Sequence, residues 1–337
     1  MAERSSLTQV VQIAPESTAG TAVTTGFKQM RSLSIEPSPS VEMDQFRPAG
    51  QKYKSFTVLG KEWVTASMSG RATFTEIVYA LSSVIDAPTI TTPASATLAR
   101  SWVFESDENN DDAPKTFTVR HGSSLIADEF TYGLVNEFGF NFTRSSIEVS
   151  GSMMGKALDT SSVTLASGGD LTSLALIPVI PTQVSIYLDD SAANLGDTKL
   201  TRVLSAEWSL GSRFSPVWPI DASLEATFAA IIESEPDLTC SLSMEADSNG
   251  VALLSAMRTS TRKFLRIEAI GAEIDAAGTA PNKNYRLTID TAVEIVDTPG
   301  FSDNDGVYTI DWNFVGVVDE TWTKAFSIEV INKLTAL

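Results

Sequence analysis

The sequence of 337 residues contains one cysteine and one histidine, and these two shortages exclude several kinds of chemistry. A lone cysteine, Cys240, cannot form an internal disulfide and is typical of a reducing compartment. A zinc site built from several nitrogen and sulfur ligands is excluded. A Ser-His-Asp triad would have to use His121, which stands at the end of a predicted strand. We therefore interpret His121 as a polar strand-end residue and Cys240 as a small buried one.

Long apolar runs and phosphate-binding loops are also missing. A membrane helix needs roughly 20 apolar residues, whereas the nearest run, LALIPVIP at 174–181, is short and contains two prolines. The first residues, MAERSSLTQV, contain no apolar segment of the kind found in signal peptides. Neither GxxxxGK[ST] nor GxGxxG occurs. The sequence thus predicts no membrane span, no signal peptide and no nucleotide loop of these types.

Positive charge is scarce: 24 Lys and Arg stand against 42 Asp and Glu, for a net charge of −18. Solubility alone can explain such a charge. The alternative is a surface that must not bind nucleic acid, because proteins that hold DNA through its phosphates are basic.

What the chain does contain is alternation. The stretch 130–155, FTYGLVNEFGFNFTRSSIEVSGSMMG, is apolar at every second residue on both sides of a polar turn, which predicts a β-hairpin. A second hairpin is predicted at 285–316. Helices are predicted at 73–85, where Thr73 and Glu76 suggest a capping box, and at 248–257. A third candidate helix spans 221–232, within a long connection. Residues 37–55 are expected to form a long excursion, and 86–114 a loop with acidic clusters.

Similar strings recur in the same order in the two halves. TQV, RSLSIE, TASMS, KTFTV and EVSGSMMG of the first half match TQV, RVLSAE, TCSLS, KFLRI and TIDWNFVG of the second. Ordered self-similarity indicates a tandem duplication, and two unrelated β-rich domains are the alternative. The expected fold class is mainly β: two tandem β-sandwich or partly open barrel domains, each with one flanking α-helix. The expected boundaries are an arm at 1–27, a domain at 28–160, a linker at 161–181 and a domain at 182–337.

Acidic loops are the remaining candidates for a site. FSDNDG at 301–306 and DENNDD at 107–112 lack the residues that an EF-hand requires, so we interpret both as solvated loops. No carboxylate pair stands out as an acid–base couple, and Trp208 and Trp312 fall on the apolar phase of their strands. The sequence therefore predicts no cofactor, no metal and no enzyme. The features that are present suit an assembly protein.

The chain resembles the tail tube (major tail) proteins of long, non-contractile-tailed bacteriophages. The stretches that carry the resemblance are GKEWVTASMSGRATFTEIVYALSS, DAPKTFTVRHG, the 130–155 hairpin, SIYLDDSAANLGDTKLTRVLSAEWSLGSRFSPVW, FSDNDGVYTIDWNFV and the closing VINKL. The resemblance implies a virion structural protein, made in the bacterial host cytoplasm, whose stacked rings form the DNA conduit of the tail. Three two-unit chains would form a pseudo-sixfold ring. The implied partners are other copies of the chain and the tape measure, tip and terminator proteins, without a membrane.

Two sets of residues follow as hypotheses. If the polar phase of the strands faces an acidic lumen that DNA crosses without binding, the lumen would contain Glu36, Glu148, Glu207, Asp290 and Asp311. If the excursion and the N-terminal arm join one ring to the next, the contact residues would be Pro37, Met43, Phe46, Arg47 and Tyr53. The alternative function is a carbohydrate- or receptor-binding β module of a tail tip or surface adhesin. A hydrolase is a third possibility, which the single histidine disfavours.

Overall fold

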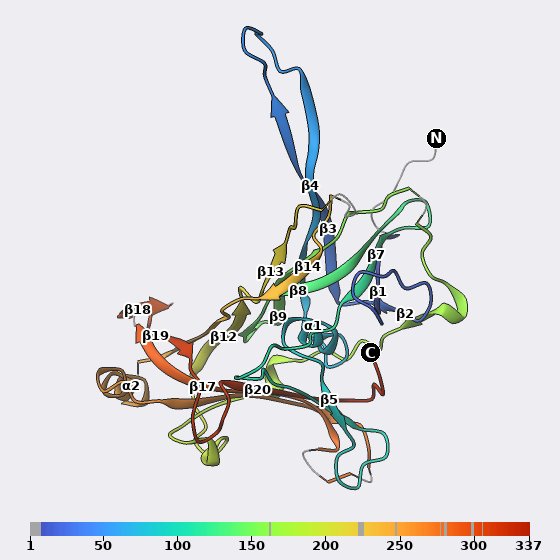
Figure 1. The fold of residues 1–337 in the computed structure, drawn as a ribbon. Helices are drawn as coiled ribbons and strands as arrows, with labels where there is room; N and C mark the ends of the chain where they lie inside the picture. The colour runs from blue at the N-terminus through green and yellow to red at the C-terminus, as the bar shows by residue number, and fades with distance from the viewer. Residues whose placement is uncertain are drawn as a thin grey trace.

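The computed structural model describes residues 8–337 except 162, 222–225, 247, 277, 280, 281, 298, 299 and 305. The protein is mainly β, which confirms the expected class, and none of the described sheets closes into a barrel. Two α-helices are described, α1 (Ile77–Val84) and α2 (Ser248–Arg258), in two of the three places where the sequence predicts helices. Figure 1 shows two layers of strands around α1, with a long hairpin that projects away from the body.

The strands of the first half pair in the order β1–β7–β8–β9–β4–β3, with every neighbour antiparallel. Their bounds, with those of the remaining strands of this half, are β1 (Val10–Pro15), β2 (Phe27–Met30), β3 (Leu33–Phe46), β4 (Phe56–Arg71), β5 (Thr89–Thr91), β6 (Arg100–Phe104), β7 (Phe117–Gly122), β8 (Ala127–Thr143) and β9 (Ile147–Gly155).

The second half repeats this order as β11–β16–β17–β19–β15–β12, again antiparallel throughout. The strands from residue 161 onward are β10 (Leu171–Ser173), β11 (Val184–Asp189), β12 (Val203–Gly211), β13 (Phe214–Val217), β14 (Ala230–Glu233), β15 (Asp237–Glu245), β16 (Lys263–Glu273), β17 (Asn284–Asp297), β18 (Phe301–Asn304), β19 (Val307–Gly316) and β20 (Phe326–Asn332). Each helix follows the same strand of its half, α1 after β4 and α2 after β15.

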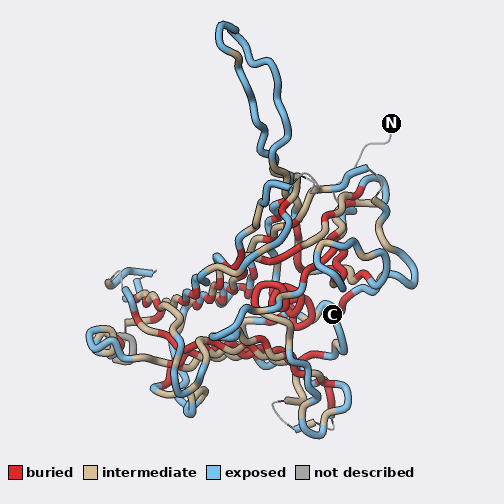
Figure 2. The backbone as a smooth tube through the Cα atoms, viewed as in Figure 1, coloured by how far each residue is buried: buried red, intermediate tan, exposed pale blue. Residues whose placement is uncertain are grey.

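Strands β13 and β14 form a separate two-stranded sheet, and the other 18 strands make one connected network that we describe as three sheets. The long sheet runs β3–β4–β9–β8–β12–β15–β19 and ends on the last part of β17 together with β18. The second sheet runs β11–β16–β17–β20–β6–β5. The side sheet runs β10–β2–β1–β7 and ends on the first part of β8. The core lies between the layers, where Figure 2 shows the buried backbone.

The long sheet passes from one half to the other at the antiparallel pairing between β8 and β12, which we call the seam. Ser205 to Leu210 of β12 pair with Phe138 to Thr143 of β8, so the sheet continues from one half into the other. Trp208 is fully buried behind the seam, and its Nε1 donates a hydrogen bond to Thr291 Oγ1 of the second sheet at 3.1 Å. A second exchange links the halves, because β6 of the first half extends the second sheet at β20.

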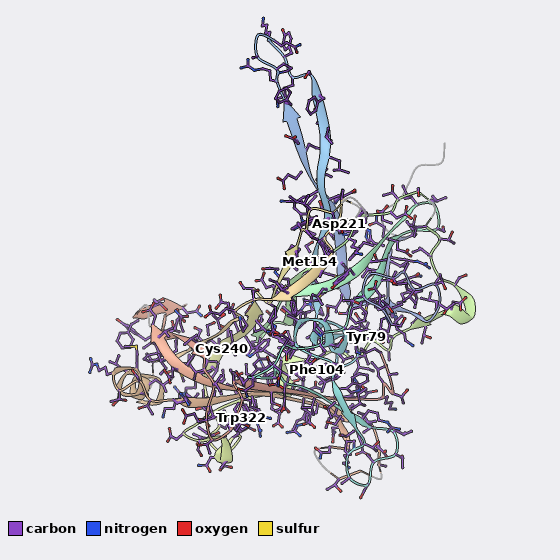
Figure 3. All side chains as sticks on the ribbon, in the orientation of Figure 1. Tyr79, Phe104, Met154, Asp221, Cys240 and Trp322 are labelled. Atoms are coloured by element: carbon purple, nitrogen blue, oxygen red, sulfur yellow. The ribbon has the colours of Figure 1, made fainter. Side chains whose placement is uncertain are left out.

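Helix α1 is buried on all sides, although the sequence predicts a flanking helix. Six of its eight residues are apolar, and its two buried serines are satisfied, since Ser82 Oγ donates to the Tyr79 carbonyl and Ser83 Oγ accepts the Val135 N–H, each at 2.9 Å. In Figure 3, Tyr79 of α1 and Phe104 of β6 lie within the body. The backbone N–H of Glu76 donates to Thr73 Oγ1 in the turn before α1, and because Glu76 is itself the N-cap residue, Thr73 does not cap the helix. The carboxylate of Glu76 does not complete the predicted capping box.

Glu76 instead holds the turn between β2 and β3. Its buried carboxylate accepts backbone N–H hydrogen bonds from Arg31, Ser32 and Leu33 at 2.8–3.1 Å. A buried carboxylate is costly unless hydrogen bonds satisfy it, and here backbone donors do so. Burial raises the pKa of Tyr79, and the charge of Glu76 adds to that rise. The turn at the start of the long sheet thus depends on one charged side chain.

The excursion expected at 37–55 is largely strand. Residues 37–46 continue β3, pair with β4, and leave only 47–55 as a loop. Pro37 and Pro39 suggested a loop, but proline is compatible with an edge strand when its nitrogen faces away from the neighbour. The N–H of Leu33 donates to Glu76, so it points away from β4. Backbone N–H directions alternate along a strand, and Pro37 and Pro39 lie an even number of residues from Leu33. Their nitrogens therefore also face the outer edge.

Three other expectations require correction. The N-terminal arm is not free, because β1 lies between β2 and β7 and is buried over most of its length. The loop 86–114 contributes β5 and β6 to the second sheet, since SWVF is an apolar strand segment. The described part of the possible helix 221–232 is irregular and then enters β14, which pairs with β13. Residues 222–225 of that segment lie outside the described residues.

Asp112 was expected in a solvated loop, yet its side chain is fully buried against Arg213. The same guanidinium pairs with Glu233 of β14, and its Nε donates to the Val84 carbonyl at the end of α1 at 2.9 Å. Arg213 thereby joins the end of α1, the 105–112 loop and the β13–β14 hairpin. Removing Arg213 would leave the buried carboxylate of Asp112 without its cation.

Replacement of Glu76 tests the turn that it holds. Glu76→Gln keeps the shape but loses the charge and places an NH₂ group against donors, so we expect the free energy of unfolding to fall by about 2 kcal/mol. Urea unfolding measures the change. Glu320→Gln, at an exposed site, is the control and should change stability by less than about 0.5 kcal/mol. Equal effects of the two substitutions would contradict this role for Glu76.

Candidate functional site

The outer face of the long sheet is the most extensive polar feature of the protein. Side chains alternate along each strand, and the strand register aligns the alternation across the sheet. Phe140, Trp208 and Cys240 are cross-strand neighbours that face the core. The next row faces outward and crosses six strands, in the order Arg71, Glu148, Asn141, Glu207, Ser241 and Asn313.

Neighbouring outward rows have the same chemistry of small hydroxyl side chains and carboxylates. One row contains Ser34, Ser69, Ser150, Gly139, Ser209 and Thr239. Another contains Glu36, Ser67, Ser152 and Glu137. Among the described residues of these three rows, Arg71 is the only cation, and its guanidinium lies 3.7 Å from the Glu148 carboxylate. These three rows are therefore acidic, and the one cation among their described residues is paired.

The structure brings together four of the five acidic residues that the sequence singled out for this face. Glu36, Glu148 and Glu207 are exposed on it, and Asp311, which is partly buried, pairs with Ser243 of β15 in the same sheet. Ser146 Oγ donates to Glu148 at 3.1 Å, and Ser241 Oγ to Glu207 at 3.4 Å. These contacts are local and leave the carboxylates on the surface.

Asp290 is not with them. It lies on β17 where that strand belongs to the second sheet, and its two carboxylate oxygens accept hydrogen bonds from Arg266 at 2.6 and 2.7 Å. Burial raises the pKa of the Asp290 carboxyl, and the contact with Arg266 opposes that rise. Nearby, Arg286 pairs with Glu268 and Glu329. Asp290 is thus part of an ion-pair ladder, because β17 changes sheets along its length.

Glu137 belongs to the polar face and was not singled out from the sequence. It is exposed on β8 and pairs with Ser152 of β9. The signal was present in NEFGFNF, where Glu137 alternates with Phe138 and Phe140. A register shift between Val135 and Glu137 interrupts the alternation at that point and obscures the phase.

Both ends of the long sheet are unpaired edges in the described part of the chain. At one end, β3 pairs only with β4. At the other end, β18 pairs only with β19, and beyond Val293 the outer side of β17 has no partner strand. Unpaired edges are templates for pairing with another chain.

Beyond the body, β3 and β4 pair only with each other, and we call residues 41–61 of this hairpin the arm. The arm carries seven exposed large apolar side chains: Val41, Met43, Phe46, Tyr53, Phe56, Val58 and Leu59. Phe46 and Phe56 stack at 5.3 Å between ring centroids. Contact with the body is seen at the base, where the Lys61 ammonium lies 5.6 Å from the centre of the Trp218 ring, and the rest of the arm projects away from the body (Figure 3). Of the expected contact residues, Met43, Phe46, Arg47 and Tyr53 are exposed here, whereas Pro37 lies lower, beside buried Ala66.

The other chemical candidates are structural. Cys240 is buried, and desolvation raises the pKa of its thiol to about 12. His121 is half-buried at the end of β7. Within the described residues, no group of three His, Cys, Asp or Glu side chains could hold a metal ion. Of the FSDNDG loop, Asp303 accepts the Gly306 N–H, and Asp305 lies outside the described residues.

No protein-family model matches the chain, and a search of curated proteins finds no significant match. Among the described residues, no helix is both long and apolar enough to cross a membrane.

Substitutions can distinguish the buried, ion-paired Asp290 from the exposed Glu207 by their effect on the free energy of unfolding. Asp290→Ala leaves Arg266, which is mostly buried, without its carboxylate partner. We therefore expect the free energy of unfolding to fall by about 3 kcal/mol. Glu207→Ala removes an exposed side chain on the polar face and should change stability by less than about 0.5 kcal/mol. Urea unfolding of both variants measures the difference. A cost for Glu207→Ala as large as that for Asp290→Ala would contradict the assignment.

Proposed function

We propose that the protein is a structural subunit whose copies assemble into stacked rings, forming a phage tail tube through which genomic DNA passes. The observation that carries the proposal is the continuous long sheet, which has one acidic, hydroxyl-rich face and an unpaired edge at each end. The family resemblance of the sequence supports the same conclusion.

The acidic face has the chemistry that a DNA conduit requires. DNA binding through phosphates depends on Lys and Arg contacts, each of which releases counterions. A wall of Ser, Thr, Asn and carboxylates offers no such contacts and repels phosphate at short range. The wall would contain Glu36, Glu148, Glu207 and Asp311, and Glu137 joins this set.

The seam supports closure of a ring. Because the two halves share one pairing order, β12 corresponds to β3, and the last part of β8 corresponds to the end of β17 with β18. Strands β8 and β12 pair within one chain. Among the described residues, the outer edges of β3 and of β17–β18 have no partner strand. Pairing β3 of one copy with β17–β18 of the next would repeat the seam, as added strands do at sheet edges. Such a head-to-tail contact forms a ring when its rotation closes, and three two-unit chains complete a pseudo-sixfold one.

This contact between copies would be weaker than the seam. At the outer edge of β3, Pro37 and Pro39 supply no N–H donors, and the N–H of Leu33 is occupied by Glu76. Carbonyl groups remain as acceptors, so a partner strand gains fewer hydrogen bonds there. Within the virion, the tape measure, tip and terminator proteins are the partners that the family resemblance suggests.

Among the described residues, exposed Phe and Tyr side chains on the arm and on the β18–β19 hairpin are the one feature that a carbohydrate-binding module could use, and no tryptophan is among them. A carbohydrate-binding module needs an exposed aromatic platform. All six tryptophans lie in the described part of the chain: Trp102, Trp208 and Trp312 are buried, and the other three are half-buried. Trp63 and Trp218, for example, pack edge to face at the base of the arm. A hydrolase would need a polar constellation in a cleft, and His121 stands without one among the described residues.

Negative-stain microscopy tests assembly. Concentrated wild-type protein is expected to form rings and hollow tubes. In the matched variant, Asn-Gly replaces residues 42–61 and closes the hairpin at the Val41–Glu62 pair, since this dipeptide favours a two-residue turn. That variant should form rings without tubes, because the arm joins one ring to the next. Normal tubes from the trimmed chain would refute the role of the arm. Wild-type chains that form neither rings nor tubes when seeded with tail tips would refute the function.

Charge reversal tests the wall. Glu148→Lys, Glu207→Lys and Asp311→Lys together should leave assembly intact but make tubes retain DNA, measurably slowing ejection, because each Lys adds a phosphate contact. Retention should weaken as salt rises. The control reverses three exposed acids outside the polar rows, Asp197, Glu235 and Glu320, and so has the same net charge. If both variants retain DNA equally, or neither does, the face is not the wall.

A further inference from the structure

A groove lies at the end of the long sheet opposite the arm. Strands β3 and β12 run in the same direction, because four antiparallel pairings separate them. The arm extends from the end of β3, whereas the groove lies where β12 begins, beside the β8–β9 turn. Figure 1 shows the arm pointing away from this end of the body. The arm of a chain therefore cannot reach its own groove.

The groove has an apolar floor and a basic rim. Its apolar lining comes from the end of β8, the start of β9, β11 and the segment that leads into β12: Phe142, Ile147, Val184, Ile186, Leu200, Val203 and Leu204. Its rim carries Arg144, Lys199 and Arg202. Lys199 Nζ donates to Ser185 Oγ, and Arg202 pairs with Glu245. Arg144 is exposed and has no carboxylate partner among the described residues. This basic rim is unusual in a chain with a net charge of −18.

One face of the arm has the complementary chemistry. In the β3–β4 register, Asp44 stands opposite Val58, and Phe46 opposite Phe56. Glu42 precedes them on the same face and pairs with Lys61 at 3.0 Å. The face thus combines three exposed apolar side chains with the carboxylate of Asp44 and the Glu42–Lys61 ion pair. Because the arm also carries Arg47, Lys52 and Lys54, Asp44 is the group that matches the basic rim. Exposed apolar patches of this kind mark contact surfaces.

We propose that the groove is the receiving site for the arm of a second copy in the next ring. Phe46, Phe56 and Val58 would cover the apolar floor, and Asp44 would lie against Arg144 and Lys199. This inference rests on the proposed tube assembly and names the partner surface of its ring-to-ring contact. Each chain has one arm and one groove at opposite ends, so a single contact propagates a stack without a second type of joint.

A charge exchange tests the contact in full-length protein. Asp44→Lys alone, and Arg144→Glu with Lys199→Glu alone, should each lower tube yield by at least about tenfold while rings persist, since like charges meet across the joint. Combining the three substitutions should restore tubes. Circular dichroism and urea unfolding verify that each variant is folded. Singles that assemble like wild type, or a combination no better than the worse single, would overturn the proposal.

A cross-link tests the same contact even if tubes do not form, so failure of the proposed function remains distinguishable. In concentrated solution under mild oxidation, Phe46→Cys with Leu204→Cys should yield chains joined by disulfides, because residue 204 is an exposed part of the groove lining. The control, Phe46→Cys with Ile220→Cys, places the second thiol on an exposed site outside the groove. Equal cross-linking of the two variants, or none in either, would overturn the proposal.

Discussion

The pairing of β8 with β12 governs the rest of the structure. Six residues of each strand merge two similar halves into one sheet, and because a strand repeats every two residues, the shared register puts the outward residues of both halves on one face. A slip of one residue would move Glu207 into the core and Trp208 onto the surface. The buried Trp208 and its hydrogen bond to Thr291 make such a slip costly.

Carboxylates serve two purposes in this chain, according to where they lie. Glu76, Asp112 and Asp290 are enclosed and satisfied by backbone donors or arginines, so they position turns, loops and strands. Those on the polar face have few partners and give the surface its charge. A large negative charge is therefore compatible with a well-ordered core, because the buried acids are paired and the others remain hydrated.

The β class, the two hairpins, both described helices and the outward phase of four of the five acidic residues followed from the sequence, since each depends on a local period. Asp290 could not be placed that way, because alternation gives the phase of a strand but not the point at which β17 changes sheets. The pairing of Arg213 with Asp112 joins residues far apart in the sequence, and no local signal marks it. Pro37 and Pro39 misled for a different reason: a proline interrupts a strand only when its nitrogen faces a neighbouring strand.

Those two prolines also affect how readily the isolated chain aggregates. A flat, donor-rich edge invites any exposed strand, including those of partly folded copies, and such pairing grows into fibres. At Pro37 and Pro39 the outer edge of β3 has no N–H groups. The carbonyls of an approaching strand therefore find no donors there, and such a pairing gains few hydrogen bonds. We therefore expect the edge of β3 to contribute little to aggregation of the isolated chain.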